Sequence, residues 1–264
     1  MRNRIRLKSK RDIEKMRQSG RSASIMLQRV GEAVRPGIST AELDQICRQT
    51  IEELGGKSSF LGYQLPNHPP YPATICSSIN EVIVHGIPTE DQILQEGQIA
   101  SIDTAIFLNG FHGDNAFTFK VGQISSEAQK LLRVTKESLY KAIEQAKPGN
   151  RLGDVCHAVQ SHVETYGFYV ADNFVGHGIG KKMHEPPQVP NVGVPGTGPR
   201  LKPGMVLAIE PMVNIGTSQS ATLDDGWTAV TSDLSLSAHF EHTVAILSDG
   251  PEILTDNPDL WEIF

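Results

Sequence analysis

The chain has 264 residues, of which 39% are hydrophobic and 20% charged, and these values are ordinary for a folded protein with a sizeable core. Its net charge of −6 argues against general nucleic-acid binding, and its three scattered cysteines are too few for a disulfide scaffold or a CxxC zinc site. No apolar run approaches the roughly 20 residues of a membrane span, and the N-terminus lacks the apolar segment of a signal peptide. We therefore expect a cytoplasmic protein that does not enter a membrane.

The N-terminal residues are an exception to the acidic balance. Up to residue 17 there are only two acids, Asp12 and Glu14, and the basic residues are Arg2, Arg4, Arg6, Lys8, Lys10, Arg11, Lys15 and Arg17. A charge run of this kind is usually a solvated tail and helix face. The sharper alternative is docking on ribosomal RNA near emerging chains, which salt would weaken.

Helices and strands are predicted to alternate along the chain without a linker. After a basic tail at 1–10, the periodicity predicts, in chain order, helices at 11–34 and 40–54, a loop at 60–80, strands at 81–84, 99–108 and 111–121, helices at 126–146 and 154–166, a loop at 185–204, and strands at 206–213 and 240–247. Ser39 with Glu42 and Ser126 with Gln129 form capping-box patterns. Asn109-Gly110 is a hairpin signal. We expect residues 11–264 to form a single domain.

The chain carries a weak internal duplication. Pro36-Gly37 and Pro148-Gly149 each precede a predicted helix, roughly 110 residues apart. Gly97 and Gly204 each lead a strand that reaches an acid six residues later, at Asp103 and Glu210. This pattern indicates a pseudo-twofold α/β unit in which each half contributes an inward carboxylate.

Two aspartates lie on the predicted hairpin. If Asn109-Gly110 is a two-residue turn, Asp114 faces Ala105 and Asp103 faces Ala116, so both aspartates share one sheet face with Cβ atoms about 7 Å apart. Two bare carboxylates at that separation would force one to stay protonated, whereas a shared cation would suit both.

Further candidate ligands follow in apolar or glycine-rich surroundings, namely His85, His177, His184, Glu210 and Glu241. Each histidine alone is more often an ordinary polar residue, and each glutamate alone is more often in a salt bridge. However, Asp103, Glu210 and Glu241 have no adjacent Lys or Arg, and acids on buried strands without basic neighbours indicate a bound cation. Four carboxylates and one imidazole suit Mn, Fe, Co or Zn, so residue chemistry predicts a dinuclear metallohydrolase and leaves the substrate open.

Five segments resemble the motifs of type I methionine aminopeptidases, and they occur along the chain in the same order as in that family. They are Ser78-Ile79-Asn80-Glu81-Val82-Ile83-Val84-His85-Gly86-Ile87-Pro88, Gly110-Phe111-His112-Gly113-Asp114, Gly176-His177-Gly178-Ile179-Gly180, Ile209-Glu210-Pro211-Met212 and Glu241-His242-Thr243. The resemblance covers the chain from about residue 11 onwards. It implies a pita-bread α/β (α+β) fold, with two pseudo-symmetric halves of antiparallel sheet surrounded by helices.

The resemblance also implies an activity and roles for the site residues. A methionyl aminopeptidase with two divalent ions (Co, Mn, Fe or Zn) would remove the initiator methionine from nascent polypeptides, mainly when the second residue is small. Asp103 would chelate one ion, Asp114 and Glu241 would bridge both, and His177 and Glu210 would complete the other. A metal-bridged hydroxide would attack the first peptide bond, with Glu210 shuttling protons, His184 bonding the scissile group and His85 contacting the substrate. We expect the enzyme to act as a monomer.

The resemblance places a methionine pocket at Phe60, Tyr63, Tyr71, Cys76, Met183 and Trp227. Thioether side chains pack well against such aromatic and polarizable groups. This sequence departs from the family pattern at Phe60, where a cysteine is common, at Met183, where an aromatic residue is common, and in a longer loop at 64–70. These departures concern the shape of the pocket rather than the metal chemistry.

Three alternatives stay open at this stage. A proline dipeptidase or aminopeptidase P uses similar ligands but usually carries a large additional N-terminal domain. A catalytically inactive binding module of the same fold would lose ligands that this chain retains. A globular protein with coincidental acids would not have five ordered motifs.

Overall fold

A computed structural model of the chain describes residues 4–66 and 68–262, so that Arg2 and position 67 of the 64–70 loop lie outside the described residues. The helices are α1 (Lys10–Ala33), α2 (Thr40–Glu53), α3 (Ser126–Gln145), α4 (Leu152–Thr165) and α5 (Pro258–Glu262). The strands are β1 (Lys57–Ser58), β2 (Ile75–Ile79), β3 (Val82–Val84), β4 (Ile99–Leu108), β5 (Phe111–Lys120), β6 (Tyr169–Val170), β7 (Val175–Gly178), β8 (Glu185–Pro190), β9 (Val206–Ile209), β10 (Met212–Asn214), β11 (Ser220–Thr222), β12 (Ala229–Thr231), β13 (Ser237–His239), β14 (Glu241–Ile246) and β15 (Pro251–Ile253).

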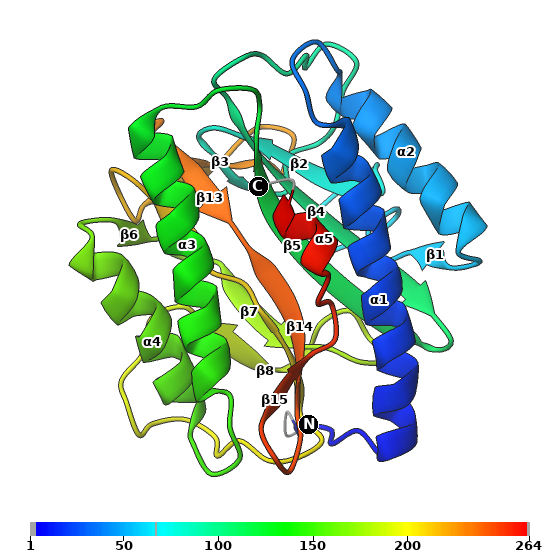
Figure 1. The fold of residues 1–264 in the computed structure, drawn as a ribbon, viewed down its shortest axis with the longest axis vertical. Helices are drawn as coiled ribbons and strands as arrows, with labels where there is room; N and C mark the ends of the chain where they lie inside the picture. Colours follow the sequence, from blue (N-terminus) through cyan, green and yellow to red (C-terminus); the bar gives the residue numbers. More distant parts are fainter. Residues whose placement is uncertain (1–3, 67, 263–264) are drawn as a thin grey trace.

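The main sheet is antiparallel and consists of two matching halves. Its strand order is β1-β4-β5-β14-β9-β7-β8, so the β4–β5 pair meets the β14–β9 pair at the β5–β14 junction. Helices α1 and α2 flank the first half and α3 and α4 the second, all on one side of the sheet (Figure 1). The predicted fold class is thus confirmed, with helices packed against antiparallel sheet.

The glycines of the predicted duplication adopt one shared backbone conformation. Gly37 and Gly149 have φ of 90° and 97°, and Gly97 and Gly204 have φ of 89° and 93°. Only glycine reaches this region without a Cβ clash, so the same turn precedes the equivalent element in each half. The repeat that was weak as a sequence pattern is therefore present in the backbone.

Helix starts follow the capping chemistry with one correction. The Ser39–Glu42 capping box is present at α2, as predicted. At α3, however, the capping residue is Ser125 rather than Ser126, because the Ser125 hydroxyl accepts the Ala128 N–H at 3.1 Å. Ser126 is the first helical residue and the residue three after the cap is Ala128, so the predicted capping box of Ser126 with Gln129 was wrong.

Two predicted loops contain strands. Within 60–80, β2 is fully buried and pairs with β4. Within 185–204, the proline-rich β8 pairs with β7 at the end of the sheet order, where a strand tolerates residues that donate no hydrogen bond. The strand predicted at 206–213 is divided into β9 and β10 at Glu210-Pro211.

Side chains along the β4–β5 hairpin point alternately into the helix-covered core and to the opposite face of the sheet. Thr104 donates to the Ala23 carbonyl of α1, and Phe117 joins the apolar core that contains Ala23. Successive strand residues point to opposite faces, so Asp103 and Asp114 point away from α1. The functional site is expected on that second face.

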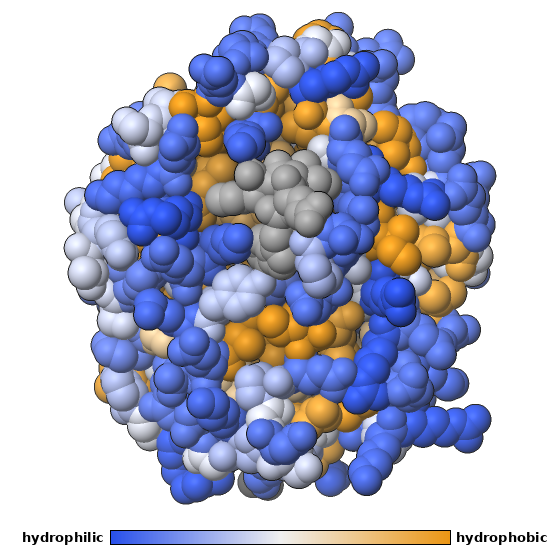
Figure 2. All heavy atoms as spheres, in the orientation of Figure 1, coloured by the Kyte–Doolittle hydropathy of each residue, from blue (hydrophilic) through white to orange (hydrophobic). Residues whose placement is uncertain are grey.

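The helix-bearing surface is covered mostly by hydrophilic residues (Figure 2). This is the distribution expected where amphipathic helices turn their polar sides outward. Across the described ranges, no helix combines the length and the hydropathy needed to cross a membrane.

Candidate metal centre and substrate cleft

A cavity of about 910 Å³ opens on the sheet face that lies away from α1. Every site residue predicted from the sequence lines it: Phe60, Tyr63, Tyr71, Cys76, His85, Asp103, Asp114, His177, Met183, His184, Glu210, Trp227 and Glu241. These residues come from segments up to about 180 positions apart in the chain, so the fold, rather than a local motif, gathers them.

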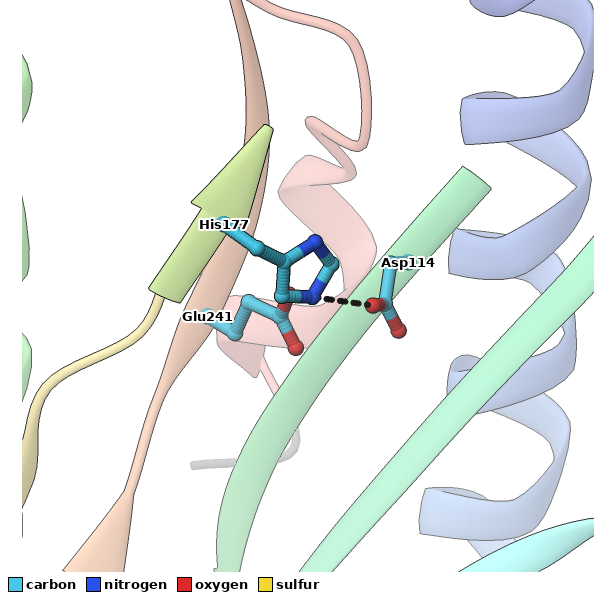
Figure 3. Close-up of side chains that lie close together, drawn as sticks. All are labelled: Asp114, His177 and Glu241. Atoms are coloured by element: carbon cyan, nitrogen blue, oxygen red, sulfur yellow. Dashed lines mark ion pairs between the residues drawn. The ribbon is translucent and has the colours of Figure 1, made fainter. Parts of the chain in front are cut away.

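Three of these side chains form a tight cluster at the junction of the two halves. Ligand atoms of Asp114 on β5, His177 on β7 and Glu241 on β14 all lie within 4.8 Å of one another (Figure 3). Glu210 follows β9 immediately, with its Oε1 3.5 Å from His177 Nε2. Asp103 lies opposite Ala116 in the β4–β5 register, as the two-residue turn predicted.

His177 is oriented as a metal ligand requires. Its Nδ1 lies 3.0 Å from the Gly178 carbonyl, and because a carbonyl only accepts, Nδ1 must carry the hydrogen. The lone pair of a neutral ring is then on Nε2, which faces Asp114 Oδ2 at 3.6 Å and Glu210 Oε1 at 3.5 Å. A backbone carbonyl that fixes the tautomer in this way is the usual support of a ligating histidine.

Three of the carboxylates have a buried oxygen without a hydrogen-bond donor among the described residues. Asp103 Oδ1, Asp114 Oδ1 and Glu241 Oε1 are buried and accept no hydrogen bond from any described residue. Burial and the negative charge of Asp114 raise the pKa of Asp103 and of Glu241 well above their ordinary values, and burial raises the pKa of Glu210 to about 8. Such a set is costly without a cation, so these residues fit divalent metal ions.

Local backbone geometry aims the second-half ligands. Pro211 restricts Glu210 to an extended conformation, which directs its side chain into the cavity. Gly176 packs against β9 so closely that a Cβ would meet the Ala208 carbonyl oxygen and lie 3.3 Å from Glu210 Cγ. The glycine before His177 is therefore needed for close approach to the neighbouring strand.

Beside the metal-ligand set lies an apolar pocket. Phe60, Tyr71, Cys76, Met183 and Trp227 form one buried cluster, and Tyr63 packs against it. Tyr71 and Trp227 meet edge to face at 5.3 Å. An unbranched, polarizable side chain is well suited to fill such an aromatic pocket.

Two histidines, His184 and His85, lie beside the apolar pocket and the candidate metal ligands. The His184 ring packs edge-on against the His177 ring with centroids 4.2 Å apart, and His184 Nδ1 lies 2.6 Å from the Tyr63 hydroxyl. Desolvation, together with the charge of His177, lowers the pKa of His184 to about 3, and burial lowers that of His85 to about 4. Both rings are therefore neutral near pH 7 and can donate or accept a hydrogen bond.

Several contributors were not identified from the sequence. His239 Nε2 lies 3.7 Å from Glu210 Oε2, and Thr243 exchanges two hydrogen bonds with the Asp114 backbone. Ile5 lines the cleft although it precedes the first helix. His239 and Thr243 flank Glu241 in the sequence, which was the available signal, whereas nothing local placed Ile5 there.

Comparison with known proteins identifies the family. Residues 14–248 match the profile of metallopeptidase family M24. The chain belongs to this family. It is 51% identical to a methionine aminopeptidase of Clostridium acetobutylicum over 95% of this chain and 98% of the relative, and 50% identical to methionine aminopeptidase 1 of Bacillus subtilis over 94% and 98%. The resemblance stated from five motifs is confirmed, and the chain is a metallopeptidase.

Solved structures of similar proteins agree with the fold. A methionine aminopeptidase of Thermotoga maritima superposes with a TM-score of 0.93 at 43% identity, covering 96% of this chain and 100% of that one. A prolidase of Pyrococcus horikoshii superposes with a TM-score of 0.76 at 20% identity and is covered over only 63% of its length. The prolidase likeness extends to the fold alone, so similarity favours the aminopeptidase branch of the family.

Proposed function

We propose that this M24 metallopeptidase is a methionine aminopeptidase, which removes the initiator methionine from nascent polypeptides, mainly when the second residue is small. The observation that carries the proposal is the adjacency of a carboxylate–imidazole cluster to a pocket of Phe60, Tyr71, Cys76, Met183 and Trp227. The cluster suits hydrolysis and the pocket suits a methionine side chain. The relatives named methionine aminopeptidase support the same substrate.

The metal-binding roles are those that the family resemblance implies. Asp114 and Glu241, at the junction of the two halves, would contact both of two divalent ions, while Asp103 would hold one ion and His177 with Glu210 the other. Co, Mn, Fe and Zn all accept such mixed oxygen and nitrogen ligands. Bound there, these ions supply Lewis-acid activation of water and of the peptide carbonyl.

The chain's own residues would do the remaining work. Glu210 would shuttle a proton during hydrolysis, a role that the family resemblance implies and that its position in the cleft beside His177 supports. With the Tyr63 hydroxyl donating to Nδ1, His184 carries its hydrogen on Nε2 and can donate to the scissile group. His85 packs edge-on against Trp227 in the cleft, and in this position it would contact the bound substrate.

We further propose that the enzyme acts in the cytoplasm as a monomer with residues 11–264 as one catalytic domain. The free cysteines Cys47, Cys76 and Cys156 support a reducing compartment. Ribosome docking would use Lys10, Arg11 and Lys15 at the start of α1, because Lys8 and Arg17 are already paired with Glu185 and Glu252. Salt-dependent cosedimentation with ribosomes tests this contact.

Peptide turnover tests the proposed function directly. Methionine release from Met-Ala-Ser, with no turnover of Xaa-Pro dipeptides, is the expected result for metal-loaded protein. Turnover of Xaa-Pro dipeptides with Met-Ala-Ser left intact would assign the chain to the dipeptidase branch instead. Absence of both activities in protein that binds metal would indicate a binding module.

A further inference from the structure

A second cavity, of about 1280 Å³, adjoins the catalytic cleft. The two cavities share wall residues, namely Ile5, His184, Glu185, Pro186 and Pro199. The second cavity contains none of the aromatic residues of the methionine pocket and none of the proposed metal ligands. Since His184 is proposed to bond the scissile group, this space lies beyond that bond, on the side where the rest of the polypeptide must leave.

The walls of the second cavity are strongly basic. Its charged lining comprises Arg4, Arg6, Lys182, Arg200 and Lys202, with Glu185 as the acid among its described lining residues. The Glu185 carboxylate is already engaged, because it accepts from Lys8 Nζ at 3.0 Å and from the Lys182 N–H at 3.2 Å. No ion pair joins the five basic side chains to a carboxylate within 4–66 and 68–262.

The N-terminal segment forms one wall of this cavity and is fixed in place. Lys8 and Glu185 are an ion pair whose side chains are only 6% and 5% exposed. The Lys8 N–H also donates to the Gly204 carbonyl at 2.7 Å. Figure 1 shows the segment before α1 at the same end of the molecule as the chain that follows β8. Arg4 and Arg6, close to this anchored residue in the chain, line the same cavity as Arg200 and Lys202.

We propose that this basic cavity binds substrate residues downstream of the scissile bond and favours acidic side chains about four to six positions from the N-terminus. The inference rests on the proposed function. The cavity exceeds the roughly 300–1,000 Å³ of a typical small-molecule site, so it accommodates several extended residues. Its charge complements carboxylates, and its continuity with the cleft favours a peptide over RNA bound on the outer surface.

The test compares three peptides of equal length, Met-Ala-Ser-Glu-Glu-Glu-Gly, its Gln counterpart and its Lys counterpart. Each kcat/KM is divided by that of Met-Ala-Ser on the same metal-loaded protein. We expect the ratio to fall about three- to ten-fold from Glu to Lys at low salt, because exposed charge pairs are individually weak, and to flatten at high salt. In the Arg200→Glu/Lys202→Glu variant the three ratios should converge, because three basic residues (Arg4, Arg6 and Lys182) then face two new carboxylates.

The control variant is Lys141→Glu/Lys147→Glu, which makes the same charge change at exposed sites on and just after α3. This variant should keep the wild-type order of the three peptides, because its charge change lies outside the cavity. Equal ratios for all three peptides in wild-type protein would overturn the proposal. It would also be overturned if the Arg200→Glu/Lys202→Glu variant lost ribosome cosedimentation but kept the wild-type order of the peptides, since the cavity would then bind RNA. Failure to cleave Met-Ala-Ser itself would instead refute the proposed function.

Discussion

The hydroxyl of Tyr63 gives a sharp test of how the cleft orients its catalytic groups. It lies 2.6 Å from His184 Nδ1, and the two rings pack at 5.2 Å. Tyr63→Phe removes the hydrogen bond and keeps the ring contact. Burial raises the pKa of Tyr63, so the hydroxyl is protonated and available to donate at neutral pH.

The size of the effect follows from the nature of that bond. A hydrogen bond between neutral groups contributes about 0.5–1.5 kcal/mol net, which corresponds to a fall in kcat of roughly 2- to 12-fold. The KM for Met-Ala-Ser should change little, because the aromatic wall of the pocket is retained. Bound metal should not change, because Tyr63 is not among the proposed ligands. Tyr169→Phe, at a half-exposed tyrosine outside the cleft, is the matched control.

A double-mutant cycle separates positioning from general damage. If Tyr63 acts through His184, then Tyr63→Phe should cost nothing further once His184→Ala is present, because coupled residues are not additive. Steady-state kinetics and metal analysis on the four proteins measure this. The reasoning is refuted if Tyr63→Phe has wild-type kcat, or if its effect is undiminished in the His184→Ala background.

Three other changes probe the same site. Asp114→Asn or Glu241→Gln should reduce turnover by at least about 100-fold and lower bound metal, because even indirect partners of ligands are worth roughly 10–100-fold; elemental analysis with peptide assays checks both. Gly176→Ala should destabilise the protein by about 1–3 kcal/mol through its Cβ clash, seen as a lower Tm with reduced turnover, and an unchanged Tm would contradict the packing argument. In metal-free protein, Glu210 has its pKa raised from 4.5 to about 8, so its stabilising contribution is complete below pH 4.5 and is lost as the pH rises towards 8. The lowered pKa values of His85 and His184 raise stability up to about pH 6.5, so the Tm should fall from about pH 6.5 to 8, and divalent metal should restore it most at the upper end.

The hairpin shows how far local sequence reasoning reaches. Asn109-Gly110 dictates a two-residue turn, a turn of that length sets the register, and the register places Asp103 and Asp114 on one face. Each step depends on neighbours in the chain, so the pair was predictable without any relative.

Other features depend on contacts between distant segments. The meeting of His177 with Glu241 required the family resemblance, because no spacing rule connects β7 with β14. The sequence predicts loops where β2 and β8 lie, because the segments that contain them are rich in turn residues, and pairing with β4 and β7 overrides that preference. The Tyr63–His184 bond spans 121 positions and leaves no local signature.

The central claim is that Asp103, Asp114, His177, Glu210 and Glu241 jointly bind divalent ions that enable peptide hydrolysis. Calorimetric titration of chelator-treated full-length protein with Mn²⁺, with Met-Ala-Ser turnover followed at each addition, measures binding and function together. The account predicts binding that approaches two ions per chain, activity that rises with it, and loss of both in Glu241→Gln. Full turnover by the metal-free protein, or wild-type binding and turnover by Glu241→Gln, would contradict it.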